Sequence, residues 1–153
     1  MTLLVRLAQP AEYGRLVTIW RAAVLATHDF LTREEVDEYE VEVERYLPSM
    51  TAVWVASEEG RLLGFVAAAG SAIEMLFVDP ERHGEGVGRT LVEHVSDRMP
   101  LVTVDVNEEN VNGRRFYSAL GFVEVGRSDL DDEGKPHPIL HLERRPGRQM
   151  VGP

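Results

Sequence analysis

The chain has 153 residues, of which 44% are hydrophobic and 27% charged, a composition typical of one globular domain. It contains no cysteine, which excludes disulfides, thiolate metal ligands and a cysteine nucleophile. The net charge of −10 disfavours a nucleic-acid partner, because such proteins need a basic surface; it fits either a cationic partner or simple solubility. No apolar run approaches the ~20 residues of a membrane span and no signal peptide is recognisable, so we expect a cytoplasmic protein without a membrane partner.

The first part of the chain predicts one strand followed by two helices. A short strand at residues 3–7 precedes a helix whose apolar residues recur at helical spacing from 16 to 27. A second helix opens at Thr32, where Glu35 stands three residues on and completes a capping box.

The rest of the chain alternates strands and helices. The expected elements are strands 52–56, 62–68 and 73–78, a helix from about residue 86, strand 101–106, helix 112–120, and strands 122–128 and 139–143. The order β-α-α-β-β-β-α-β-α-β-β predicts an α/β fold (α+β by some schemes) with a mixed, mostly antiparallel sheet of about seven strands and helices on both faces. We expect a single domain over residues 1–144 and a flexible tail over residues 145–153.

A glycine-rich segment, His83-Gly-Glu-Gly-Val-Gly-Arg89, lies between the strand ending at Val78 and the helix that starts near Gly86. Glycines at a helix start let backbone N–H groups converge on an anion, which the helix dipole also attracts. Arg82 and Arg89 suit phosphate oxygens. The spacing differs from a P-loop and from a dinucleotide-binding fingerprint. We therefore interpret the segment as a phosphate or pyrophosphate site rather than a flexible connector.

This segment resembles the coenzyme A signature of the GNAT superfamily, Gln/Arg-x-x-Gly-x-Gly/Ala. Gly86 and Gly88 match its small-residue positions, and His83 stands where Gln or Arg is usual. A second segment, Asn110 to Phe122, resembles the family's Asn-x-x-Ala-x-x-Phe-Tyr-x-Lys-x-Gly-Phe, with Gly113 in place of Ala. Nearly the whole chain, including the segment 26–31, is similar to the YjaB-type bacterial acetyltransferases.

The resemblance implies a GNAT fold and an acetyl-CoA-dependent N-acetyltransferase. The coenzyme-binding residues that it implies, together with the loop itself, are Leu76, Phe77, Val78, His83, Gly84, Glu85, Gly86, Val87, Gly88, Arg89, Asn110 and Tyr117. Histidines are few and poorly spaced, so we expect no metal cofactor.

Acetyl transfer to an amine by direct attack in a ternary complex needs a base for the amine and an acid for the departing thiolate. The resemblance makes Tyr117 the acid; its other interpretation is core packing, which the adjacent Phe116 suits better. Glu74 is the first candidate base because it interrupts an apolar strand, although a solvated strand end explains it nearly as well. His28 is the second, although a lone histidine at such a position is more often structural; Asp29 is a candidate for orienting it or holding a cationic acceptor.

The expected acceptor is a small-molecule or peptidic amine, bound by the 27–31 turn, the second helix and the 129–136 loop. An α-amino acid, a polyamine, a drug and a protein lysine all remain open, as do monomer and homodimer. The alternative from another class is a non-catalytic module that binds or senses acyl-CoA.

Overall fold

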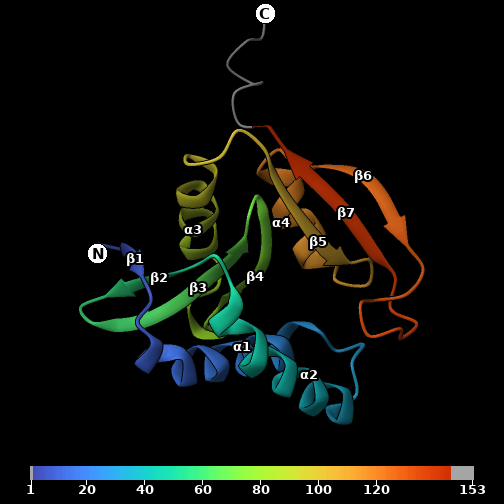
Figure 1. Cartoon of the computed structure of the whole chain (residues 1–153), viewed down its shortest axis with the longest axis horizontal. Coiled ribbons are helices and arrows are strands. Elements are labelled where there is room, and N and C mark those ends of the chain that lie inside the picture. The colour runs from blue at the N-terminus through green and yellow to red at the C-terminus, as the bar shows by residue number, and fades with distance from the viewer. Residues whose placement is uncertain (1, 146–153) are drawn as a thin grey trace, which may run out of the picture.

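The computed structural model describes residues 2–145, so the expected tail lies outside the described residues apart from Arg145. The elements follow the predicted order (Figure 1). They are β1 (Leu4–Leu7), α1 (Tyr13–Thr27), α2 (Arg33–Tyr46), β2 (Ala52–Glu58), β3 (Arg61–Ala69), β4 (Ala72–Val78), α3 (Val87–Ser96), β5 (Val102–Asn107), α4 (Val111–Ala119), β6 (Val123–Ser128) and β7 (Ile139–Arg144), with short 3-10 helices η1 (Pro10–Glu12), η2 (Leu47–Ser49) and η3 (Pro80–Arg82).

The seven strands form one mixed sheet in the order β1-β2-β3-β4-β5-β7-β6. Neighbouring strands are antiparallel except β4 and β5, which are parallel. The parallel pair is joined only at Ala72–Thr103 and Ile73–Val104. The prediction of a mostly antiparallel sheet is confirmed, and its one parallel junction is also its weakest.

Helices cover both faces of this sheet, as predicted (Figure 1). On one face, α1 and α2 pack over Phe65 and Ala67 of β3. On the other, α3 and α4 pack over Leu63 and Val66 of the same strand. A central strand buried on both sides reads as a continuous apolar run, which explains the residues of β3.

The helix ends follow from local side-chain chemistry. The Thr32 hydroxyl accepts the Glu35 N–H at 3.0 Å, and the Glu35 carboxylate accepts the Thr32 N–H at 2.9 Å, which confirms the capping box. At α4 the Asn110 side chain accepts the Gly113 N–H at 2.9 Å. Within residues 2–145 no helix is both long and apolar enough to cross a bilayer.

Candidate active site

The site lies where β4 and β5 separate. Past Ile73 and Val104 the two strands no longer pair with each other, while β4 continues along β3 to Val78 and β5 continues along β7 to Asn107. The facing edges therefore carry backbone N–H and C=O groups without ladder partners. A cleft of about 710 Å³ fills this gap and is lined by both segments that the sequence singled out.

A β-bulge places Glu74 in this cleft. Ala67 pairs with Met75 and Ala68 with Ile73, so Glu74 is an extra residue of β4 without a partner on β3. A bulge re-aims the side chain of the extra residue. Glu74 lines the cleft and is exposed, as expected for a carboxylate in an otherwise apolar strand.

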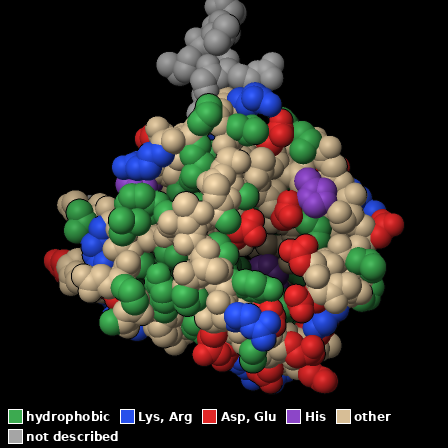
Figure 2. Space-filling view, viewed as in Figure 1, with side chains coloured by type: hydrophobic (Ala, Val, Ile, Leu, Met, Phe, Trp, Pro, Cys, Tyr) green, Lys and Arg blue, Asp and Glu red, His purple; other side chains and the backbone are tan. Residues whose placement is uncertain are grey.

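Carboxylates gather around Glu74. Although Glu74 is exposed, the surrounding protein partly desolvates its carboxylate, and this desolvation and the nearby charges of Asp105 and Asp132 raise the pKa of the Glu74 carboxyl above its usual range. Asp105 lines the same cleft from β5. Figure 2 shows acidic side chains around a hollow on this face, near the ends of α1 and β5. A raised pKa makes Glu74 a stronger base than an ordinary glutamate, and the surrounding charge favours a cation.

The glycine loop has the geometry of an anion site at the start of α3. Gly84 and Gly86 have φ of +82° and +86°, conformations that side chains rarely adopt, and Gly86 is the N-cap residue of α3 without a side-chain cap. The first N–H groups of α3 therefore lack a side-chain partner at the cap. Gly88 has a packing role as well, because a Cβ there would lie 3.2 Å from the Phe116 ring.

The charged side chains in and beside the glycine loop differ in whether they contact other protein groups. The His83 Nε2–H donates to the Val78 carbonyl at 3.0 Å, so this side chain ties the loop to the end of β4. Arg82, 15% exposed, forms ion pairs with Glu58 and Glu85. Among the described residues Arg89 forms no ion pair; it is exposed and lines the cleft. Arg89 is therefore the better placed of the two expected phosphate-binding arginines.

Tyr117, on α4, lines the cleft. Its ring packs between Phe116 and Phe122, with ring centroids at 5.0 and 5.2 Å. Tyr117 is 7% exposed and is buried more deeply than Phe116, so the expectation that Phe116 takes the core position was wrong. Within residues 2–145 its hydroxyl has no hydrogen-bond partner. Burial raises the pKa of this hydroxyl, which keeps it protonated at neutral pH and able to donate a proton.

His28, at the C-cap of α1, also lines the cleft. Burial lowers the pKa of its imidazole to about 4, against a smaller opposite effect of Asp29. The ring is therefore neutral at pH 7 and a weaker base than an ordinary histidine. Its Nε2 lies 3.4 Å from the Asn110 side-chain nitrogen, so α1 and α4 meet across the cleft.

The cleft brings together every predicted site residue except Glu85, which is bound to Arg82, and Asp29. Sequence reasoning missed Asp105, Asn107 and Asn112, which also line it. The sequence does contain a signal for Asp105: it is a carboxylate between Val104 and Val106 in a strand, and in the structure it is exposed while both valines are buried.

The three segments expected to bind the acceptor contact one another: the Phe30 ring of the 27–31 turn packs on His137 of the β6–β7 loop, and that loop is hydrogen-bonded to α2. The Tyr39 hydroxyl of α2 donates to Asp131 in the β6–β7 loop. From the same loop, His137 donates to Glu35 of α2 at 2.8 Å and to Glu109 at 3.0 Å. Burial opposes the charge of His137, but the two carboxylates outweigh it and raise the pKa of the imidazole. The β6–β7 loop is therefore held against α2 by hydrogen bonds from both Tyr39 and His137.

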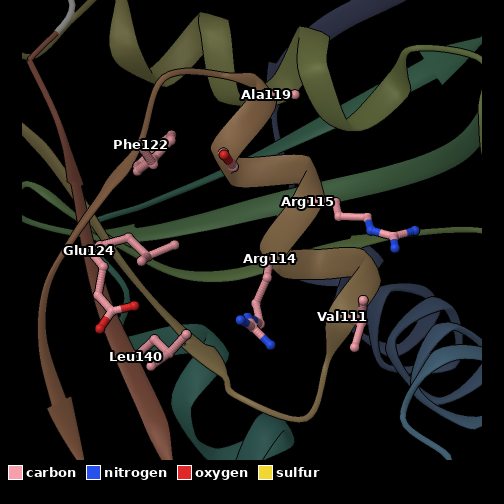
Figure 3. Close-up of a pocket in the computed structure, with 9 residues that line it drawn as sticks. Val111, Arg114, Arg115, Ala119, Phe122, Glu124 and Leu140 are labelled. Carbon is pink, nitrogen blue, oxygen red and sulfur yellow. The ribbon is translucent and has the colours of Figure 1, made fainter.

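A second hollow, of about 570 Å³, lies between α4 and the strands β6 and β7 (Figure 3). Arg114 extends from α4 toward the strands, whereas Arg115 points away from them (Figure 3). Apart from these arginines and Glu124, its lining is mostly apolar, and it holds none of the predicted site residues. The part of the chain that the structure describes has no group of three or more His, Asp or Glu side chains placed to hold a metal ion.

Comparison with known proteins decides the family. Residues 25–138 match the acetyltransferase (GNAT) domain. The chain is 43% identical to the peptidyl-lysine N-acetyltransferase YjaB of Escherichia coli K12, over 93% of this chain and 97% of YjaB. The chain is a GNAT-family acetyltransferase.

Solved structures agree with this assignment. The solution structure of apo YjaB from Escherichia coli superposes with a TM-score of 0.87 at 42% identity, covering 94% of this chain and 97% of YjaB. The PaiA N-acetyltransferase of Thermoplasma acidophilum, solved in complex with coenzyme A, shares the fold at 17% identity with a TM-score of 0.75, covering 95% and 99% of the two chains. As a GNAT acetyltransferase, the chain is an N-acetyltransferase that takes its acetyl group from acetyl-CoA.

Proposed function

We propose that this acetyltransferase moves the acetyl group of acetyl-CoA to a primary amine by direct attack in a ternary complex, with Tyr117 as general acid and Glu74 as general base. The observation that carries the proposal is one cleft lined by both residues. In it the hydroxyl of the largely buried Tyr117 has no hydrogen-bond partner within residues 2–145, and a β-bulge presents a carboxylate of raised pKa.

The chain has the groups that the cofactor requires. The unpaired edge of β4, over residues 76–78, can bond the amides of the pantetheine arm as a neighbouring strand would. The loop from Gly84 to Gly88 and the start of α3 offer N–H groups to the pyrophosphate, and Arg89 offers a positive charge. Asn110 lines the cleft and can bond a pantetheine amide.

Acetyl-CoA supplies a thioester whose acetyl carbon can be attacked by an amine nitrogen. A lysine-like amine, with a pKa of ~10.4, arrives protonated, so Glu74 accepts its proton before attack. The C–N bond forms and the C–S bond breaks, and Tyr117 donates its hydroxyl proton to the departing sulfur. His28 is the weaker candidate base, because burial disfavours its protonated form while it favours protonation of Glu74.

The acceptor that we infer is a lysine side chain of a peptide or protein. The relative YjaB is named a peptidyl-lysine N-acetyltransferase. The charges of Asp105 and Asp132 near Glu74 support a cationic acceptor beside Glu74.

The test is release of coenzyme A thiol from acetyl-CoA with a panel of lysine peptides, free amino acids and polyamines, followed by mass spectrometry of the products. We expect thiol release that depends on the amine, with a gain of one acetyl group on the lysine ε-nitrogen. Tight binding of acetyl-CoA without amine-dependent release, across the panel, would instead identify a non-catalytic acyl-CoA-binding module.

A further inference from the structure

A chain of hydrogen bonds crosses the cleft from α1 to α4. The Thr27 hydroxyl lies 2.7 Å from the Ala23 carbonyl oxygen and 2.8 Å from Nδ1 of His28. Nε2 of His28 lies 3.4 Å from the Asn110 side-chain nitrogen. The Asn110 side-chain oxygen accepts the Gly113 N–H at 2.9 Å. The last of these contacts caps the first turn of α4.

Each proton in this series of hydrogen bonds has one consistent position. A carbonyl oxygen only accepts, so the single Thr27 hydroxyl proton points to Ala23. The Thr27 oxygen then accepts, and His28 must carry its proton on Nδ1. At the other end, the Asn110 oxygen already accepts from Gly113, so its amide nitrogen is the one that faces His28. Nε2 of His28 is therefore an unprotonated acceptor.

The absence of a side chain at position 113 permits this contact. A Cβ on Gly113 would lie 2.5 Å from the Asn110 side-chain nitrogen and 2.9 Å from its Cγ. Real Cβ contacts are essentially never shorter than 3.0 Å, so an alanine here would force Asn110 to another rotamer. The atoms in the way belong to a side chain, and the helix backbone can therefore keep its course.

Phe30 and Thr27 fix the ring itself. The Phe30 ring packs on His28 at 5.3 Å and on His137 at 5.8 Å. His28 is thus held at one nitrogen by Thr27, on one side by Phe30, and presents the other nitrogen to Asn110.

We propose that His28 is a positioning residue that holds the Asn110 side chain across the cleft, and that glycine at position 113 makes this contact possible. The proposal rests on the proposed function in one respect, namely that Asn110 contacts the cofactor. It separates the two candidate bases: Glu74 accepts the amine proton, and His28 acts on cofactor binding through Asn110.

The experiment compares G113A with H28F and H28Q in the full chain. G113A displaces Asn110 and leaves the histidine intact; H28Q keeps an amide oxygen near the place of Nε2, and H28F removes the acceptor. G14A is the matched control, because it is also a helical glycine and a Cβ there meets nothing within 4 Å. Thermal unfolding confirms that each variant is folded.

We expect the KM for acetyl-CoA, and the Kd of coenzyme A by calorimetry, to rise about tenfold in G113A and H28F, the scale of one lost hydrogen bond to a held group. H28Q should recover most of this loss, and kcat at saturating acetyl-CoA should change less than about threefold in all of them. In the wild type, nitrogen NMR of the imidazole should show His28 protonated on Nδ1 alone from pH 6 to 8, and G113A should shift its Nε2 resonance.

Three results would overturn the proposal. They are a His28 ring protonated on Nε2 in that pH range, a G113A variant with unchanged coenzyme A affinity and an unchanged Nε2 resonance, or a loss of coenzyme A affinity in H28Q as large as that in H28F. The NMR and calorimetric measurements need no turnover. Failure to find any amine acceptor would therefore refute the proposed reaction, whereas the NMR and calorimetric results would still decide the role of His28.

Discussion

Replacement of Tyr117 by phenylalanine should separate catalysis from stability. The ring packs between Phe116 and Phe122, and phenylalanine keeps that packing. The hydroxyl that is removed has no partner within residues 2–145, so no hydrogen bond of the fold is lost. We therefore expect the free energy of unfolding to change by less than about 1 kcal/mol, since removing an unpaired polar group leaves no orphaned partner.

The kinetic effect should be much larger. A positioned general acid contributes about 10²–10⁴-fold to the rate, which corresponds to about 3–5 kcal/mol of activation free energy. Thiol release at saturating acetyl-CoA and amine measures kcat, and urea unfolding measures stability in the same preparations. A control, Y117A, removes the ring as well and should cost about 3–5 kcal/mol of stability.

One result would refute this reasoning directly. If Y117F retained the wild-type kcat, the hydroxyl would not be the proton donor. A loss of kcat accompanied by a loss of several kcal/mol of stability would show that the hydroxyl supports the fold, contrary to its lack of a partner. Y117F with normal stability and low kcat is the expected outcome.

Three other changes test neighbouring parts of the site. E74Q should lower kcat by about 10²–10⁴-fold and remove the acid limb of the pH–rate profile. In the wild type this limb should lie above the usual glutamate pKa, because the pKa of Glu74 is raised. An unchanged profile would eliminate Glu74 as the base. R89A should raise the KM for acetyl-CoA several-fold, on the scale of one phosphate contact, and leave kcat unchanged. The rise should be smaller at high salt, and the control R15A on α1 should leave the KM unchanged. Equal effects of R89A at low and high salt would contradict a charge contact. His137 has a raised pKa in the folded chain, so its contribution to stability is complete below the unfolded value of ~6.5 and is lost as pH rises through the folded value. Wild-type thermal stability should therefore fall between pH 6 and 8 more than that of H137Q, and parallel curves would refute the ionic role.

The order of elements and the layering of the fold follow from the sequence because they depend on short-range patterns. The 16–27 helix has a clear helical period, the Thr32–Glu35 box is a local hydrogen-bond pair, and β3 is apolar on both faces. Segment ends differed from the structure by one or two residues, as for the strand expected from residue 3 that begins at Leu4.

The parts that could not be predicted depend on pairing between distant segments. The bulge at Glu74 exists only relative to its partner strand β3, so a period of two cannot reveal it. The partnership of Arg82 with Glu58 spans 24 residues and two loops, and nothing local distinguishes Arg82 from Arg89. Likewise Gly113 reads as a small deviation from a motif, and its meaning depends on where the Asn110 side chain lies.

The two-pair junction between β4 and β5 divides the sheet into two halves that carry different parts of the site. Strands β1 to β4 contribute Glu74 and lead into the glycine loop, while β5, which pairs with β7, leads into α4 and Tyr117. Each half is internally well hydrogen-bonded, and the seam between them has unpaired backbone on both sides. If the pantetheine arm lies in that seam as proposed, it takes the place of a missing strand between β4 and β5. The molecule that carries the acetyl group would then also complete the sheet between the proposed base, Glu74, and the proposed acid, Tyr117.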